Sequence, residues 1–356
     1  MVEMKRSMAA LALLCALTSS AVDTNGVKWI DGRLLPIEGR AFDDTERYYD
    51  RLPSNVTSNV NGGVRSLKRH TSGMSFRFVT DAKRLFFRWS LLSPAAGSKN
   101  MGRTGTSGID VYARSKGGKW KYRTTGSPAE SSKEGVLSVG WTPLDECLVY
   151  LPLYNGIDEF FVGMEPEAKA YPPPPHAGAS RPVVFYGTSI THGGSASRPG
   201  LSFVNIIGRL RDLPVVNLGF SGAGRMELEM AEHIARIDAS CYVLDCLWNM
   251  DERGVKERYE PFVRALRAKR PDVPIVMAGQ CDVFCGKPNS RELHVRAVYD
   301  KLSSEGWKRV SYLPKDGMFN GDREGTVDGC HPNDRGMESL AKAFGDAVVD
   351  AIGCGK

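Results

Sequence analysis

The spacing of hydrophobic residues along this chain changes once, near residue 170. Before that point, short runs of alternating apolar and polar residues are separated by Gly, Ser, Asn and Pro, which is typical of antiparallel strands joined by turns. The clearest runs cover residues 75–79, 85–90, 109–113, 119–123, 147–151 and 159–163. We therefore predict an all-β sandwich, jelly-roll-like in architecture, over residues 26–170.

After residue 180, short and continuously apolar runs alternate with amphipathic stretches. The apolar runs cover residues 183–186, 215–218, 242–247, 275–278 and 310–313, and the last amphipathic stretch covers residues 337–352. This alternation predicts an α/β unit with a parallel sheet covered on both faces. We assign residues 181–354 to it, and we expect its active site beyond the carboxyl ends of the strands.

A proline run from Tyr171 to His176 separates the two patterns. Proline has no backbone N–H to donate to a strand ladder, so such a run favours an extended, semi-rigid spacer. We therefore predict that residues 171–180 link two domains. Two domains are also what a chain of 356 residues usually forms.

The first 21 residues follow a different pattern. Lys5 and Arg6 precede an apolar stretch over residues 8–17, and small residues follow at positions 19–21. This order is typical of a secretory signal peptide, so we expect an exported protein, periplasmic or secreted, after removal of residues 1–21. A buried N-terminal helix and lipid attachment at Cys15 are alternatives that the pattern supports less well. No other segment is long and apolar enough to predict a membrane span.

Composition narrows the range of partners. Charged residues make up 25% of the chain and the net charge is +6, but Lys and Arg are dispersed among acidic residues, so nucleic-acid binding is not indicated. Seven cysteines follow residue 21, and Cys281 and Cys285 are close enough in sequence to pair in a loop. Cys and His do not cluster in a way that predicts a metal site. The sequence leaves the oligomeric state open.

Candidate chemistry begins directly after the first apolar run of the α/β unit, in the sequence Gly-Thr-Ser-Ile-Thr-His-Gly-Gly. A serine on a sharp turn from strand to helix, here Ser189, exposes its hydroxyl at the edge of the sheet. Its own N–H then lies beside an attacked carbonyl group. Taken alone, the motif is equally consistent with a helix cap.

The next two apolar runs are also followed by residues suited to acyl transfer. Gly222 offers a backbone N–H and Asn249 a side-chain N–H for the oxygen of an attacked carbonyl, and each such donor is typically worth about 10²–10³-fold in rate. The alternatives are a tight turn for the glycine and a helix cap for the asparagine. Individually, these alternatives are the commoner interpretation.

Asp328 and His331 lie in a turn just before the last amphipathic stretch. Acyl transfer needs an imidazole to accept the serine proton and a carboxylate to orient that imidazole, and a three-residue spacing can bring the two together. His192 is the competing base, but it follows Ser189 by only three residues, so we interpret it as a residue that lines the pocket. Four such segments at successive strand ends favour a common site.

These segments resemble, block by block, the SGNH hydrolase (GDSL-type esterase and lipase) superfamily over residues 181–352. The resemblance implies a three-layer, flavodoxin-like α/β fold. It also implies Ser189 as nucleophile, Asp328 and His331 as the other triad members, and the Ser189 N–H, Gly222 and Asn249 as oxyanion donors. Thr188 stands where the name-giving motif has Asp, and Trp248 stands where the third block usually has Gly.

The preceding region contains Asp110 and Tyr112 in the sequence Ser-Gly-Ile-Asp-Val-Tyr. This segment is similar to the N-terminal "GxDLY" sandwich that accompanies one bacterial SGNH subgroup, although both residues are also typical of an ordinary strand. Members with these two domains resemble carbohydrate-directed esterases. We therefore expect a serine esterase for short-chain, above all acetyl, esters of carbohydrates or other small molecules, with no metal or organic cofactor.

Substrate contacts are expected from His192, Arg198 and Trp248, since an aromatic face beside polar donors suits a sugar ring. Three other functions remain open. A lipase or thioesterase would use the same triad with a larger apolar channel. In a non-catalytic carbohydrate-binding protein, the sandwich would bind the glycan and the α/β half would be vestigial. A phosphate-binding α/β protein is disfavoured because the Gly-rich turn contains no lysine.

Overall fold

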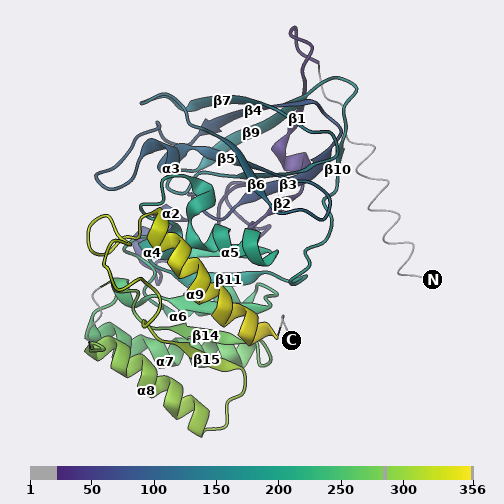
Figure 1. The fold of residues 1–356 in the computed structure, drawn as a ribbon. Helices are drawn as coiled ribbons and strands as arrows, with labels where there is room; N and C mark the ends of the chain where they lie inside the picture. The colour runs from purple at the N-terminus through teal and green to yellow at the C-terminus, as the bar shows by residue number, and fades with distance from the viewer. Residues whose placement is uncertain (1–21, 284–286, 354–356) are drawn as a thin grey trace, which may run out of the picture.

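The computed structural model describes residues 22–283 and 287–353. The expected signal peptide and Cys285 lie outside these residues. Two stacked antiparallel sheets form the first half of the chain, and a parallel sheet with helices on both faces forms the second half (Figure 1). This arrangement confirms the predicted fold class, an all-β sandwich followed by a three-layer α/β unit.

The sandwich consists of a four-stranded and a six-stranded sheet. In spatial order, the first contains β1 (Lys28–Asp31), β9 (Ile157–Met164), β4 (Arg84–Leu91) and β7 (Glu134–Gly140). The second contains β10 (Ala170–Tyr171), β3 (Ser75–Thr80), β8 (Glu146–Tyr150), β5 (Ile109–Arg114) and β6 (Lys121–Gly126), with β2 (Ile37–Glu38) also paired to β3. Aromatic side chains such as Phe76, Trp89 and Phe160 fill the space between the sheets.

Each of the six runs predicted as strands in this region overlaps a strand of the sandwich. Strands β1 and β7 and the two-residue strands β2 and β10 were missed. β7 is an edge strand in which Val136 is 77% exposed, so its alternation does not follow a buried face. The short helices α2 (Gly62–Leu67) and α3 (Arg103–Ser107) interrupt the strands and were not predicted either.

The α/β half contains five parallel strands in the order β12 (Val215–Gly219), β11 (Val183–Gly187), β13 (Cys241–Asp245), β14 (Ile275–Ala278) and β15 (Val310–Leu313). Its helices are α4 (Ser189–His192), α5 (Phe203–Arg211), α6 (Leu228–Ala235), α7 (Glu252–Lys269), α8 (Ser290–Ser304) and α9 (Asp334–Ile352). Alternate strand residues pack against α6, α7 and α8 on one face and against α5 and α9 on the other. β13 ends earlier than predicted, because the chain turns into a 3-10 helix at Leu247–Asn249.

The core of the α/β half also contains residues from the first half of the chain. Phe42, Leu52, Val60 and Val64 are buried in the same cluster as Tyr186 of β11. The segment between β2 and β3 therefore leaves the sandwich and covers one face of the parallel sheet. The two halves are joined by this shared core as well as by the proline-rich segment.

Candidate active site

Ser189 lies where the sharp turn predicted from the sequence occurs, at the first position of α4 directly after β11. Thr188 caps the helix by accepting a hydrogen bond from the Ile190 N–H. Gly187 has to be glycine, because an added β-carbon would lie 2.0 Å from the Thr191 hydroxyl oxygen. This close packing fixes the turn and leaves the Ser189 side chain at the edge of the sheet, 8% exposed.

The structure brings Ser189, His331 and Asp328 together in one chain of hydrogen bonds. Ser189 Oγ lies 2.9 Å from His331 Nε2, and His331 Nδ1 lies 2.8 Å from Asp328 Oδ2. With the carboxylate as acceptor, Nδ1 carries the proton and Nε2 is left free to accept one from the serine. The arrangement has the connectivity that an activated serine nucleophile requires.

Asp328 is held by the turn that it shares with His331. Its Oδ1 accepts hydrogen bonds from the backbone N–H groups of Cys330, at 3.0 Å, and of His331, at 2.7 Å. Burial raises the pKa of this carboxyl, but the hydrogen bonds from the backbone and the ring of His331 outweigh it and lower the pKa to about 2. Asp328 therefore stays ionised, and keeps its orientation toward the imidazole, at any pH near neutrality.

A residue of the sandwich half, which the sequence did not single out, completes this group. Asn100 Nδ2 donates a hydrogen bond to Asp328 Oδ2 at 3.3 Å, on the same oxygen that faces the imidazole. Asn100 comes from the segment between β4 and β5. No local pattern marks it, because the contact depends on how the two halves pack.

The two predicted oxyanion donors lie on adjacent segments. Gly222 is exposed, has a φ of 67°, and leaves open space where a β-carbon would stand. Asn249 Nδ2 donates to the carbonyl oxygens of Phe220, at 3.1 Å, and Gly224, at 3.3 Å, on either side of Gly222. In this structure the Asn249 amide thus braces the loop that presents Gly222, rather than pointing unpaired toward the serine.

His192 differs from its predicted role as a residue that lines the pocket. Its side chain has no exposed surface, its Nε2 lies 2.7 Å from the Leu153 carbonyl oxygen, and its ring stacks on Tyr154 at 4.1 Å. Burial lowers its pKa well below the ordinary histidine value. His192 is therefore a neutral core residue behind the nucleophile, and the sequence could not reveal this burial.

Arg198 was predicted to contact substrate, but it contacts the sandwich instead. Its guanidinium donates to Asp110 Oδ2 at 2.8 Å and to the Tyr112 hydroxyl at 2.6 Å. Asp110 Oδ2 also accepts from the Gly200 N–H at 2.7 Å. Asp110 and Tyr112 are thus more than strand residues, because they fasten the segment after α4 to β5.

Trp248, the third predicted contact, is half-buried, and its indole N–H donates to the Cys281 carbonyl oxygen at 2.5 Å. It packs against the same core as α5 and α9. Like Arg198, it does not belong to the residues that line the cavity beside His331.

That cavity has a volume of about 430 Å³ and lies between the two halves. The sandwich contributes residues from the segment before α3, among them Asn100 and Met101, and the α/β half contributes Gly194, Ser195 and Ser221. Tyr154 forms part of the wall, and its hydroxyl donates to the Ser189 carbonyl oxygen at 3.2 Å. The volume is in the range of small-molecule sites, about 300–1,000 Å³.

No helix among residues 22–283 and 287–353 is long and apolar enough to cross a membrane. Within the same ranges, no group of three or more His, Cys, Asp and Glu side chains is arranged to hold a metal ion.

Comparison with solved structures finds the same two-part architecture in several proteins. A candidate GDSL-like lipase from Bacteroides ovatus is 29% identical, with a TM-score of 0.80 over 92% of this chain and 98% of the other. A salicylyl-acyltransferase from a tetracycline biosynthetic pathway is 19% identical, with a TM-score of 0.72 over 93% and 99%. A family two carbohydrate esterase from Clostridium thermocellum, solved with cellohexaose, is 13% identical, with a TM-score of 0.56 over 79% and 93%. At these lower identities the last two show a shared fold.

Comparison with curated proteins finds no significant sequence match. Family models, in contrast, match both halves of the chain. Residues 27–170 match the N-terminal GxDLY domain of SGNH-hydrolase-type esterases, and residues 180–349 match the GDSL-like lipase/acylhydrolase family. The chain therefore belongs to the two-domain SGNH hydrolases, as its sequence motifs indicated, and is an enzyme that acts on ester bonds.

Proposed function

We propose that this enzyme is a serine esterase that removes short acyl groups, above all acetyl, from carbohydrates. The observation on which the proposal rests is the 2.9 Å contact between Ser189 Oγ and His331 Nε2, with Asp328 Oδ2 at 2.8 Å from the other ring nitrogen. In this mechanism Ser189 is the nucleophile, His331 the general base and Asp328 the residue that orients the imidazole.

Acylation begins when Ser189 Oγ attacks the ester carbonyl carbon and its proton passes to His331 Nε2. The negative charge on the carbonyl oxygen is stabilised by the N–H groups of Ser189 and Gly222. Asn249 supports this oxyanion hole by bracing the loop around Gly222 and, as a further donor, when one of its amide hydrogens turns toward the substrate. The C–O bond to the sugar then breaks, and the sugar oxygen takes the proton from His331.

Deacylation repeats these steps with water in place of the serine. His331 takes a proton from water as its oxygen attacks the acyl-enzyme carbonyl, and the proton returns to Ser189 Oγ as the acid leaves. Every proton is accounted for by Ser189, His331 and the two oxygens of substrate and water. The reaction therefore draws on no redox partner and no co-substrate other than water.

A carbohydrate substrate is supported by the uncharged hydroxyl and amide groups of the cavity wall and by the structural neighbours. Its wall contains hydroxyl and amide side chains, including Ser195, Ser221 and Asn155, together with the apolar side chains of Pro94, Ala96 and Met101. One neighbour of similar fold is a carbohydrate esterase whose structure contains cellohexaose.

We also propose that the enzyme acts outside the cytoplasm, where polysaccharides are found. The support is the pattern of basic, apolar and small residues over positions 1–21. Expression of the full chain followed by N-terminal sequencing of the product in the extracytoplasmic fraction tests this. Recovery of an uncleaved chain in the cytoplasm would contradict it.

The esterase proposal is tested by assaying the enzyme and its Ser189→Ala variant on p-nitrophenyl acetate, butyrate and a long-chain ester. We expect the variant to lose at least about 10³-fold in kcat, because its attacking hydroxyl is gone. Ser304→Ala, on the exposed side of α8, is the matched control and should behave like the unaltered enzyme. Equal activity of the Ser189 variant would refute the nucleophile assignment, and a long-chain preference would favour a lipase.

A further inference from the structure

The segment after α4 contains a strained serine. Ser195 has a φ of 70°, in the left-handed region that a residue with a β-carbon rarely adopts. Strain of this kind persists only where the surrounding structure imposes it, and it is concentrated at functional sites. Here the preceding residues are held close to the catalytic group, since a β-carbon on Gly194 would lie 3.4 Å from His331 Cδ2.

The strained backbone directs a side chain that has no partner within the described residues. Ser195 is 8% exposed and lines the cavity, yet its hydroxyl makes no hydrogen bond there. A buried hydroxyl without a partner costs free energy, so its presence beside a cavity indicates a ligand group that pairs with it.

Other polar side chains of the cavity are already used inside the protein. The Thr106 hydroxyl donates to the Ala96 carbonyl oxygen, and Asn155 Nδ2 donates to the carbonyl oxygen of Ser93 at 3.0 Å and to Ser107 Oγ at 3.2 Å. These contacts fix the shape of the sandwich wall. Ser195 differs from them, because its buried hydroxyl has no such partner among the described residues.

The cavity wall also contains no lysine, arginine, aspartate or glutamate among the described residues that form it. A substrate carboxylate or phosphate enclosed here would lose water without meeting a cation, which is unfavourable. Sugar hydroxyls, in contrast, can exchange water for the hydroxyls and amides of the wall. The chemistry of the cavity thus matches an uncharged, polyhydroxylated ring.

We propose that this cavity binds the uncharged sugar ring of an acylated glycoside, and that the Ser195 hydroxyl bonds one of its hydroxyls and thereby sets specificity. The inference rests on the proposed esterase function and names its substrate class. Uronic acids, sialic acids and phosphorylated sugars are excluded from the ring position. Ser195 acts on binding of the alcohol part of the ester and takes no part in the transfer of the acyl group.

The test uses the full chain and three substrates: an acetylated methyl glucoside, the equally acetylated methyl glucuronate, and p-nitrophenyl acetate. For the unaltered enzyme, we expect kcat/KM to be at least about tenfold higher on the glucoside than on the glucuronate. Similar or reversed values would overturn the uncharged-ring assignment. Hydrolysis of p-nitrophenyl acetate alone would overturn the sugar assignment and leave the esterase standing, whereas no hydrolysis of any ester would refute the esterase as well.

The role of Ser195 is tested by Ser195→Gly, which removes the hydroxyl and suits the left-handed backbone. Its kcat/KM on the glucoside should fall about tenfold further than on p-nitrophenyl acetate, mainly through KM. Ser131→Gly is the matched control, since Ser131 has a φ of 62° but is exposed and outside the cavity wall. Equal losses on both substrates, in a variant whose thermal unfolding is unchanged, would overturn the role of Ser195.

Discussion

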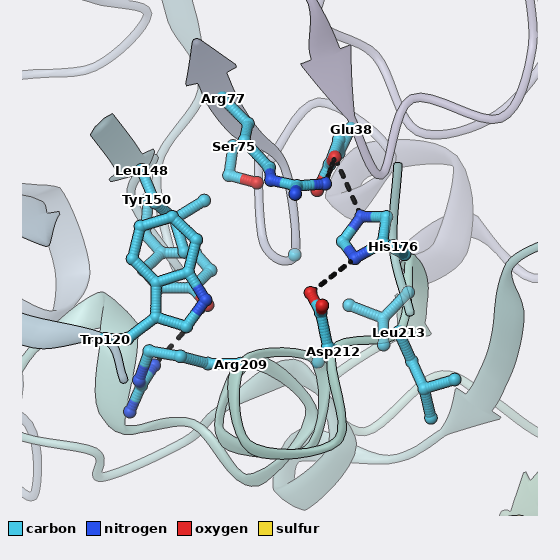
Figure 2. A pocket seen from close by; sticks show the side chains of 13 residues that line it. Glu38, Ser75, Arg77, Trp120, Leu148, Tyr150, His176, Arg209, Asp212 and Leu213 are labelled. Atoms are coloured by element: carbon cyan, nitrogen blue, oxygen red, sulfur yellow. Dashed lines mark hydrogen bonds and ion pairs between the residues drawn. The ribbon is translucent and has the colours of Figure 1, made fainter. Parts of the chain in front are cut away.

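Two cavities lie between the same two halves of the molecule, and their walls differ in charge. The cavity beside His331 is about 430 Å³ in volume, and hydroxyl, amide and apolar side chains form the rest of its wall. The cavity beside His176 is about 20 Å³ in volume, hardly more than one water needs, and is surrounded by charged groups (Figure 2). His176 bridges Glu38 of the sandwich, at 2.9 Å, and Asp212 of the α/β half, at 3.1 Å.

Most charges of the smaller cavity are matched in a network of ion pairs, whereas Arg209 on its wall donates to the Gly200 carbonyl oxygen at 2.9 Å. Arg77, whose side chain is 2% exposed, pairs with Glu38 and Glu146, and Arg114 pairs with Glu146 at 2.8 Å and Asp212 at 3.3 Å. Such a network fixes two surfaces in one register but leaves nothing for a ligand. The same interface therefore serves both as a joint, where most charges are paired, and as a site, where polar groups are uncharged and partly unpaired.

Asp328→Asn should have the largest effect, on the open cavity. The change removes the carboxylate that accepts from His331 Nδ1, and with it the preference for the tautomer that can deprotonate Ser189. We expect kcat on p-nitrophenyl acetate to fall about 10³-fold. Thermal stability near pH 7 should fall slightly as well, because the lowered pKa of this partly exposed carboxyl means that its ionised form stabilises the folded state above pH 3.8. Asp322→Asn, in an exposed ion pair with Arg335, is the control and should leave kcat within twofold. A small loss in the Asp328 variant would mean that His331 is oriented by other groups.

Glu146→Gln should weaken the charged joint between the two halves. The change leaves two arginines partly unpaired in a buried region, and breaking a buried pair typically costs about 3–5 kcal/mol of unfolding free energy. We expect a clear drop in the denaturation midpoint while kcat of the folded enzyme is kept. Glu257→Gln, in an exposed i,i+4 pair on α7, should not change the midpoint measurably. A loss of kcat without any drop in the denaturation midpoint would show that the charged network affects the geometry of the catalytic group.

Asn100→Ala should have a smaller effect, because it removes a positioning residue and leaves the carboxylate in place. Without the amide, Asp328 loses one of the donors that hold it against the imidazole, so kcat should fall about tenfold while KM for p-nitrophenyl acetate stays nearly constant. Asn100→Asp keeps the shape but places a like charge beside Asp328, so its kcat should fall further. Lys99→Ala, on the exposed neighbour, is the control. A change confined to KM would contradict positioning and indicate a direct substrate contact.

Features encoded by neighbouring residues were those that the sequence could predict. Alternating apolar and polar residues identified the sandwich, and the alternation of strands and helices identified the parallel sheet. The three-residue spacing of Asp328 and His331 was enough to anticipate their contact, because one turn contains both. The turn at Ser189 was likewise marked by Gly187 and Thr188. In each case local geometry decides the outcome.

Features that depend on packing between the halves could not be predicted. Asn100 and Asp328 are 228 positions apart in sequence, and no sequence pattern predicts a contact over that separation. Arg198 was expected at the substrate, since the sequence does not show that a buried Asp110 stands opposite it. For the same reason, residues 42–64 were assigned to the sandwich although their apolar side chains complete the α/β core.

Asp245 is a buried carboxyl whose substitution should have the smallest effect, which is confined to the pH dependence of stability. This carboxyl is buried at the end of β13 on the catalytic side, where it accepts from the Thr191 hydroxyl at 2.7 Å and lies 3.5 Å from Cys281 Sγ. In contrast to Glu146, it has no arginine or lysine as a hydrogen-bond partner among the described residues. Burial raises its pKa to about 7, which the hydrogen bonds only partly offset.

The sign of the resulting pH dependence follows from linkage. A carboxyl with a pKa of about 3.8 when unfolded and about 7 when folded binds its proton more readily in the folded state. Its contribution to stability is complete below pH 3.8 and is lost as the pH rises through 7.

In Asp245→Asn the amide remains neutral, so the denaturation midpoint should decline less between pH 5 and pH 8 than in the unaltered enzyme. At pH 8 the variant should be the more stable of the two. Asp238→Asn, on an exposed ion pair, should keep the original slope. Identical slopes for both variants would mean that Asp245 is ionised in the folded enzyme and that the catalytic side, like the joint, contains a buried charge.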